Sequence, residues 1–289
     1  MPARTHHTAP ALAPVDDALA AVRRRRGPEG TGGLADGLVV ADVADPAGWL
    51  PASDLVSGEA LDDLLAAAGR FWRAEPHAAA ALAWRMYTYW LVMPPVLGWA
   101  TARRVPLLDP GDVLVRINDR KPFVTVGLRR VRVATLPTDP LAAGPEAAGA
   151  PPGGPSPDAA PTGTAEVVPV GGERELLAVL RATLRTGHLD PLLARIQDRV
   201  RLGTRTLLGS LASAVAYAVV RGVEAAPDEI YRAANTLLST LDVADLVTLE
   251  PGADGHPAVW RHTCCLAFTI PEPKICSGCP LRRSPAPPL

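Results

Sequence analysis

The chain has 289 residues, and its 48% hydrophobic content is sufficient for the buried core of one large domain or two small ones. Its 29 basic and 30 acidic side chains leave a formal net charge of −1, so no overall field attracts nucleic acid or anionic lipid. A nucleic-acid-binding protein is therefore not indicated, and any recognition by charge must be local.

Residues 1–33 are rich in Pro, Gly and Arg, and we predict that they are disordered. They lack the apolar stretch of a secretory signal, and a Gly-rich run follows the arginines at 23–26. No later apolar segment has the roughly 20 uninterrupted residues that a membrane-spanning helix needs. The sequence therefore predicts a cytoplasmic protein without a transmembrane segment.

Residues 34–136 are predicted to form an N-terminal α+β part. Apolar residues at helical spacing predict helices over 61–73 and 78–92, and Pro94 and Pro95 are expected to stop the second helix. Two runs rich in β-branched residues, at 113–118 and 122–126, flank a polar turn and predict a β-hairpin. A third strand is expected over 131–135.

Residues 137–165 are rich in Pro, Gly and Ala, which is typical of a linker or a long surface loop. Residues 166–260 are predicted to be a helical part, because apolar stripes alternate with turn residues over 173–185, 189–203, 205–221 and 227–241. The predicted fold class is mainly α (α+β): a helical core, a small antiparallel hairpin or sheet in the first half, and a C-terminal four-cysteine segment over 261–289.

The four cysteines of the chain lie close together, as a Cys264-Cys265 pair followed after ten residues by Cys276-Ser-Gly-Cys279. A reducing cytoplasm favours thiolate ligands over disulfides. Neighbouring side chains on an extended strand point to opposite faces, so the adjacent pair shares one centre more readily if that centre is larger than a single ion. We therefore predict a 2Fe-2S cluster on all four cysteines.

Other chemistry fits parts of this pattern. A structural Cys₄ zinc site uses the same ligands, usually as two separated Cys-x-x-Cys pairs. A disulfide between Cys276 and Cys279 would leave an adjacent pair that closes only a strained ring. An iron–sulfur sensor, or an electron carrier without a siderophore substrate, also remains an alternative.

The segment from Arg261 to Pro280 resembles that of the FhuF-type ferric iron reductases. Members of this family close with Cys-Cys, ten residues and Cys-x-x-Cys, preceded by an Arg and followed by Pro, and the cysteines and Pro280 match that arrangement. Weaker similarity extends to the helices predicted over 78–92 and 205–221, while the Pro-, Gly- and Ala-rich stretch is longer than in the shorter members.

The resemblance implies a cytoplasmic enzyme of iron acquisition, a ferric-siderophore reductase. Its cluster would pass one electron to iron(III) in a hydroxamate siderophore, and iron leaves because hard oxygen ligands hold iron(II) less tightly. The residues provide no glycine-rich nucleotide loop, so we expect the electron to come from a separate donor protein or a small reductant. No catalytic residue is expected beyond the cluster and its ligands.

Charged residues near the cysteines are expected to contact the cluster or its sulfurs: Arg261, His262 and Arg282. Cations and an aromatic in the first half are candidates for siderophore binding: Arg85, Tyr89, Arg103, Arg104 and Arg116. Aromatics at helical spacing are also typical of a core, and arginines that follow a helix often contact its last carbonyls.

Overall fold

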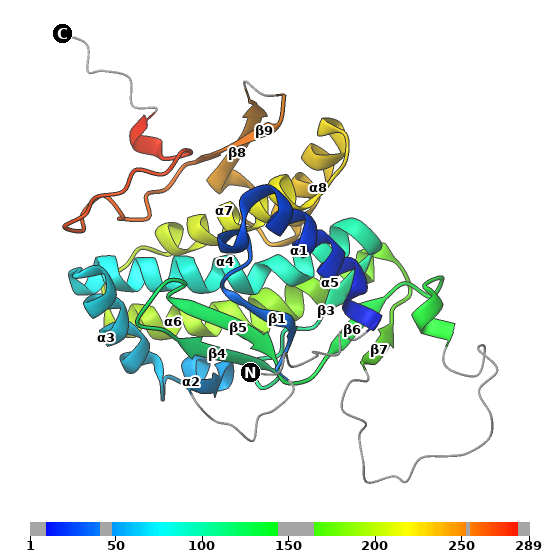
Figure 1. Cartoon of the computed structure of the whole chain (residues 1–289), viewed down its shortest axis with the longest axis horizontal. Coiled ribbons are helices and arrows are strands. Elements are labelled where there is room, and N and C mark those ends of the chain that lie inside the picture. The colour runs from blue at the N-terminus through cyan, green and yellow to red at the C-terminus, as the bar shows by residue number, and fades with distance from the viewer. Residues whose placement is uncertain (1–9, 41–47, 144–164, 253–254, 283–289) are drawn as a thin grey trace.

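The computed structural model describes residues 10–40, 48–143, 165–252 and 255–282. It confirms the predicted mainly α (α+β) class, with long helices and three small sheets (Figure 1). Buried side chains from both sides of the predicted linker belong to one hydrophobic cluster, so the two parts share a core. Most of that linker, 144–164, lies outside the described residues.

The N-terminal segment is helical where it is described, so the prediction of disorder over 1–33 is wrong for residues from Pro10 onward. A short 3₁₀ turn (Pro10–Leu12) leads into α1 (Ala13–Arg26). Apolar side chains at helical spacing are buried against α4 (Pro76–Ala102) and α7 (Thr204–Gly222): Leu12, Val15, Leu19 and Val22. Each such burial contributes about 2 kcal/mol, which outweighs the segment's loop-like composition.

Helix α4 (Pro76–Ala102) forms the centre of the core and packs against α1, α3 (Leu61–Trp72) and α7. The expected stop at Pro94 and Pro95 is wrong, because the helix continues through both. Each proline removes one backbone hydrogen bond, but α4 is buried almost all round from Ala78 to Trp99, and this packing outweighs the loss. Among the described residues, none of the helices has the length and hydropathy needed to cross a membrane.

The predicted hairpin is confirmed as β4 (Val113–Ile117) and β5 (Val124–Leu128), which pair antiparallel. They occupy the middle of a four-stranded sheet. Strand β1 (Leu34–Val39) pairs parallel with β5, and β2 (Trp49–Pro51) pairs antiparallel with β4. A short helix, α2 (Ala52–Ser57), follows β2.

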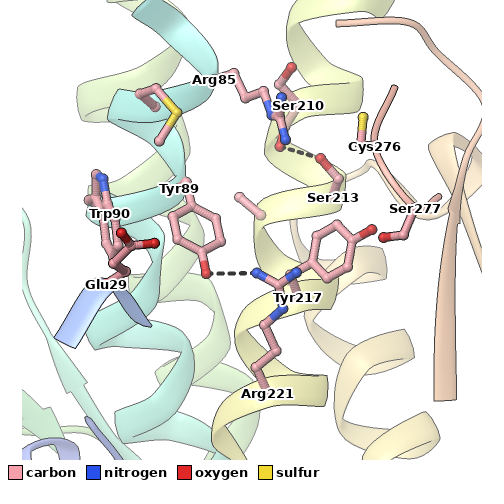
Figure 2. A pocket seen from close by; sticks show the side chains of 12 residues that line it. Glu29, Arg85, Tyr89, Trp90, Ser210, Ser213, Tyr217, Arg221, Cys276 and Ser277 are labelled. Atoms are coloured by element: carbon pink, nitrogen blue, oxygen red, sulfur yellow. Dashed lines mark hydrogen bonds between the residues drawn. The ribbon is translucent and has the colours of Figure 1, made fainter. Parts of the chain in front are cut away.

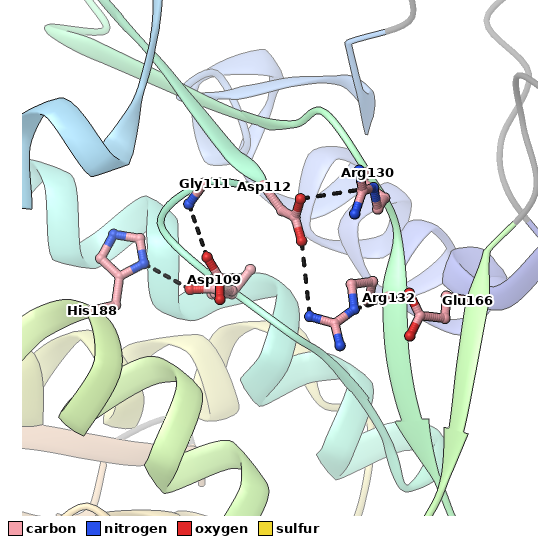
Figure 3. Close-up of polar contacts among 8 residues, drawn as sticks. Asp109, Gly111, Asp112, Arg130, Arg132, Glu166 and His188 are labelled. Carbon is pink, nitrogen blue, oxygen red and sulfur yellow. Dashed lines mark hydrogen bonds and ion pairs between the residues drawn. The ribbon is translucent and has the colours of Figure 1, made fainter. Parts of the chain in front are cut away.

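The predicted third strand is β6 (Arg132–Thr135), and it lies in a separate sheet between β3 (Arg104–Pro106) and β7 (Glu166–Pro169). Ion pairs join this sheet to the turn before β4. Asp112 lies 3.9 Å from Arg130 and 4.0 Å from Arg132, whose guanidinium also contacts Glu166 at 3.1 Å (Figure 3).

Most of the segment 166–260 is helical, but β7 lies at its start and a pair of strands at its end. Its helices are α5 (Glu173–Leu180), a π-helical stretch (Arg181–Leu189), α6 (Asp190–Arg199), α7 (Thr204–Gly222) and α8 (Pro227–Thr240). A 3₁₀ turn (Ala244–Leu246) then leads into an antiparallel pair, β8 (Val247–Pro251) and β9 (Pro257–Arg261). In Figure 1 this pair and the cysteine segment lie on the other side of α4 and α7 from the four-stranded sheet.

His188 is fully buried in the π-helical stretch. Its Nδ1 lies 2.8 Å from the Leu108 carbonyl oxygen, and its Nε2 lies 2.6 Å from the Tyr87 hydroxyl. A carbonyl only accepts, so Nδ1 carries the proton and Nε2 accepts from Tyr87. Burial lowers the pKa of His188 to about 4, so the ring is neutral at pH 7.

Candidate metal centre

The cysteine segment, residues 261–282, follows β9 and is held mainly by backbone hydrogen bonds. The Arg261 N–H donates to Gly278, the Lys274 N–H donates to Ala267, and the Cys279 N–H donates to Cys276 at 3.1 Å, which closes the Cys-Ser-Gly-Cys turn. These bonds fold the segment back on itself. All four cysteines are present as free thiols.

Two of the four thiols lie within hydrogen-bond distance of each other. Cys265 Sγ and Cys276 Sγ are 3.9 Å apart, and Cys264 Sγ accepts a hydrogen bond from the Leu266 N–H at 3.3 Å. Leu266 has a positive φ of 61°, and this kink lets the adjacent pair depart from a plain extended strand. In the described part of the chain, no three His, Cys, Asp or Glu side chains converge closely enough to hold a metal ion as they stand.

Two glycines let the segment approach its neighbours. A Cβ on Gly278 would lie 2.0 Å from the Val259 carbonyl oxygen, and a Cβ on Gly209 of α7 would lie 1.7 Å from Thr263 Oγ1. Real Cβ atoms do not come this close, so both positions require glycine unless the backbone shifts. Gly278 is thus required by close packing against β9, since its φ is not positive.

Two arginines face the thiols without a carboxylate partner among the described residues. Arg85 of α4 donates to Cys265 Sγ at 3.5 Å. Arg261 is 3% exposed; its Nη2 donates to Ser210 at 3.2 Å, and its Nε has no hydrogen-bond partner. A buried cation without a balancing anion is costly. The sulfurs are the nearest groups that balance it once they ionise.

The electrostatics of the Cys265–Cys276 pair fit that account. The Cys276 thiol donates to Cys265 and lowers the pKa of Cys265, and the positive charges of Arg85 and Arg261 lower it further. The same hydrogen bond raises the pKa of Cys276, because one proton is shared by the pair. The donor set, four thiols with cations and a backbone N–H directed at them, fits a thiolate-bound cluster.

The other predicted neighbours of the cluster have different roles. His262 is exposed, and both of its ring nitrogens are engaged at 2.7 Å, by the Asp245 carbonyl and the Thr248 hydroxyl. Arg282 contacts the Ile275 carbonyl at 3.4 Å. Neither side chain donates to a sulfur, so only Arg261 of this predicted group contributes charge to the site.

A cavity of about 270 Å³ lies between α4 and α7 and is closed on one side by the cysteine segment (Figure 2). We call it the α4–α7 pocket. Its polar lining residues are Glu29, Arg85, Tyr89, Ser210, Ser213, Tyr217, Arg221, Cys276 and Ser277. The structure thus brings two of the predicted substrate residues, Arg85 and Tyr89, to one pocket with a predicted cluster ligand.

A second cavity of about 320 Å³ shares Glu29, Arg85 and Trp90 with the first. We call it the aromatic pocket. Its lining includes Phe71, Trp72, Phe123, Lys121 and Lys274. The two cavities therefore adjoin along one side of α4, and both border the cysteine segment.

The remaining arginines predicted to bind substrate serve the fold. Arg103 caps α4 through the Trp99 carbonyl at 2.9 Å and pairs with Glu173. Arg104 makes two hydrogen bonds to Asp139, at 2.7 and 3.0 Å. Arg116 stacks on the Trp49 ring, 5.0 Å from its centroid. None of the three lines the α4–α7 pocket or the aromatic pocket, and their role as substrate residues stays a prediction.

Sequence reasoning missed Tyr217 and Arg221, which α7 contributes to the α4–α7 pocket. Arg221 donates to the Tyr89 hydroxyl at 3.0 Å and stacks on Tyr217 at 4.2 Å. Tyr217 and Arg221 are four residues apart on one predicted helix, so the sequence alone places them on the same helix face. Only the packing of α7 against α4 brings them to Tyr89.

Searches against protein-family models and against curated proteins find no match to this chain. The functional interpretation therefore depends on the residues of the site.

Proposed function

We propose that this chain binds a 2Fe-2S cluster through Cys264, Cys265, Cys276 and Cys279 and reduces ferric iron held by a hydroxamate siderophore. The FhuF-type spacing of the cysteines first indicates this activity. The observation that carries the proposal is a pair of arginines, Arg85 and Arg261, that have no carboxylate partner among the described residues and face free thiols beside a pocket. We place the reaction in the cytoplasm, where thiols stay reduced.

The cluster, when bound, supplies a one-electron couple. Arg85 and Arg261 stabilise the negative charge of the four thiolates, and the Leu266 N–H donates to Cys264. Cys276 lines the α4–α7 pocket, so a chelate in that pocket lies against one predicted ligand. The substrate iron(III) gains one electron and becomes iron(II), which the hydroxamate oxygens bind more weakly.

The electron must come from outside the chain. A separate donor protein or a small reductant is oxidised by one electron in each turnover. Three large apolar side chains on the cysteine segment are exposed, Phe268, Ile275 and Leu281, and they provide apolar surface near the site.

The test is purification under nitrogen, with assays of iron, zinc and acid-labile sulfide and with visible and paramagnetic resonance spectra before and after dithionite. We expect two irons and two sulfides per chain, and a reduced protein that a ferric trihydroxamate reoxidises as iron(II) appears. Cys276→Ser should lose the cluster, and Ser277→Ala in the same turn should keep it.

A colourless, zinc-loaded protein would contradict the proposal and leave a structural Cys₄ site. A protein that carries the cluster but is not reoxidised by any ferric chelate would instead be an iron–sulfur sensor or an electron carrier.

A further inference from the structure

Arg221 places a positive charge in the α4–α7 pocket beside Tyr89 and Tyr217. Arg85 donates to Cys265 Sγ, whereas the side-chain hydrogen bond of Arg221 goes to the Tyr89 hydroxyl. Arg221 also forms no ion pair with the described residues; its partners are the neutral rings and hydroxyl of Tyr89 and Tyr217. Its charge is therefore available to something that enters the pocket.

The guanidinium of Arg221 is held in place for such a ligand. One of its nitrogens, Nη1, donates to Tyr89, and the planar group stacks on the Tyr217 ring (Figure 2). An arginine has five N–H donors, so several remain free. A fixed planar fork matches a carboxylate, which accepts two parallel hydrogen bonds.

A second cation, Arg26, does not line the pocket but is close enough to Arg221 for the two charges to interact. Burial lowers the pKa of Arg26, and the charge of neighbouring Arg221 lowers it further, so the two guanidiniums repel each other. An anion between or beside them would relieve that repulsion. Arg25 is already paired with Glu224 at 3.5 Å, and the pocket's own carboxylate, Glu29, forms no ion pair with either Arg26 or Arg221.

We propose that the α4–α7 pocket binds the carboxylate arm of an anionic ferric chelate, with Arg221 as the residue that recognises it. This inference rests on the proposed reductase function and narrows its substrate class. A trihydroxamate iron centre is itself neutral, so the selected substrate carries a carboxylate in addition to its iron-binding groups. The arm lies along α7 beside Tyr217, and Cys276 and Ser277 form the wall nearest the iron.

The experiment uses two linear trihydroxamates that differ only in one pendant group, an ammonium in one and its N-succinyl carboxylate in the other. Each is loaded with gallium(III), which has the charge and size of iron(III) but is not reduced. Titration calorimetry then measures binding to the whole protein without any electron transfer. We expect the carboxylate chelate to bind about tenfold more tightly, the effect of one charge-assisted hydrogen bond.

Single substitutions test whether Arg221 causes the preference for the carboxylate chelate. Arg221→Gln should remove it, Arg221→Lys should keep part of it, and Arg174→Gln, an exposed arginine on α5 without an ion pair among the described residues, should leave it unchanged. The visible spectrum and iron content of Arg221→Gln should match those of the wild type. With the iron chelates, the same variant should lose about tenfold in the reduction rate of the carboxylate form at limiting concentration.

Equal affinity for the two gallium chelates, no binding of either, or a preference that survives in Arg221→Gln would overturn the inference. These outcomes are separate from failure of the proposed function. A protein without a cluster that still prefers the carboxylate chelate refutes the reductase and supports the pocket, whereas a reductase that handles both iron chelates equally refutes the pocket alone.

Discussion

The polar cluster around His188 and the cysteine segment both contain buried polar groups, but they differ in how those groups are hydrogen-bonded. His188 is fully buried, and both of its ring nitrogens have protein partners, Tyr87 and Leu108. In the cysteine segment, Arg261 is almost as buried, but its Nε and the hydroxyl of Thr263 have no partner. The His188 cluster thus satisfies its polar groups internally, whereas these two atoms of the cysteine segment, like Trp90 Nε1 and Trp99 Nε1 of α4, have no partner among the described residues.

The two regions also differ in their hydrophobic contacts, which are fewer in the cysteine segment. Tyr87 belongs to the large core cluster, whereas the cysteine segment contributes Cys265, Ala267 and Ile270 to a small cluster with Leu82 of α4. A short irregular segment with so few buried contacts and unpaired buried donors has low local stability. We infer that a bound group provides the rigidity that the segment lacks, as metal binding does for small metal-binding domains.

The largest expected effect follows from removing one ligand. Cys265→Ser should abolish the iron content and the visible absorbance, and hydrogen exchange of backbone amides over 261–282 should accelerate strongly. Amides of α4 and α7 should stay protected, because their stability comes from the core cluster. Hydrogen exchange read by mass spectrometry measures both regions in one sample.

Ser277→Ala, one residue from Cys276, is the matched control and should exchange like the wild type. Equal protection of 261–282 in Cys265→Ser and the wild type would show that the segment is as self-sufficient as the core.

The next effect is steric and confined to the Cys-Ser-Gly-Cys turn. Gly278→Ala places a Cβ 2.0 Å from the Val259 carbonyl oxygen, so the turn must move away from β9. We expect a cost of about 3 kcal/mol within the segment and rapid loss of iron to a chelator. Gly203→Ala is the control, since the nearest atom to its added Cβ is 4.0 Å away. Unchanged iron retention in Gly278→Ala would contradict the close approach.

The parts of this structure that sequence predicted well are those set by local pattern. The hairpin of β4 and β5 follows from β-branched runs around a polar turn, and the cysteine spacing identified the candidate site. The helix through Pro94 and Pro95 was not predictable in this way, because burial along α4 decides it. Helix α1 did leave a signal, an apolar stripe that includes Leu12 and Val15, but its Pro, Gly and Arg content masked it.

The residues of the α4–α7 pocket show most clearly what sequence reasoning does not predict. Arg85 and Tyr89 were predicted from one helix, while Arg221 donates to Tyr89 from 132 positions away in the sequence. Arg103 and Arg104 have the same residue type and lie closer along the chain to Tyr89, but they cap α4 and bind Asp139. Long-range packing of α4 on α7 separates these roles, and a single sequence does not encode that packing in any local pattern.

The buried histidine predicts a pH effect on the core. In the folded state the pKa of His188 is about 4, against 6.5 for an ordinary histidine, so the unfolded chain binds more protons between these values. Its contribution to the free energy of unfolding therefore falls as pH drops below 6.5, by about 2 kcal/mol from pH 7 to pH 5.

Asp16 opposes this trend. Burial and then the charge of Asp17 raise the pKa of Asp16 to about 6, so the folded state binds the extra proton and gains stability as pH falls from 6 towards 3.8. The loss of unfolding free energy that His188 causes in acid should thus be clear in Asp16→Asn, where Asp16 no longer opposes it. It should be absent in the double variant Asp16→Asn with His188→Gln. Urea unfolding at each pH measures both. The same pH dependence in both variants would rule out His188 as its source.

The smallest effect concerns the arginines that serve the fold. Arg104 and Asp139 are 15% and 8% exposed at their side chains, so Arg104→Gln leaves a largely buried carboxylate without its partner. We expect a loss of about 1 to 2 kcal/mol in the free energy of unfolding, while the exposed pair of Arg205 and Asp245, tested by Arg205→Gln, should lose under about 1 kcal/mol.

The Arg104 effect also has a direction in pH. Burial raises the pKa of Asp139, but the hydrogen bonds from Arg104 and the Leu141 N–H outweigh burial and lower the pKa below its usual value. The stability that this pair contributes is present above the ordinary carboxyl pKa and is lost as pH falls through the lowered one, so the deficit of Arg104→Gln should shrink in acid. Gallium chelate binding should be unchanged in this variant, because Arg104 lines neither pocket. A weakened affinity of this variant for the gallium chelates would show that Arg104 takes part in binding, and the arginines of the core could then no longer be separated from those of the site.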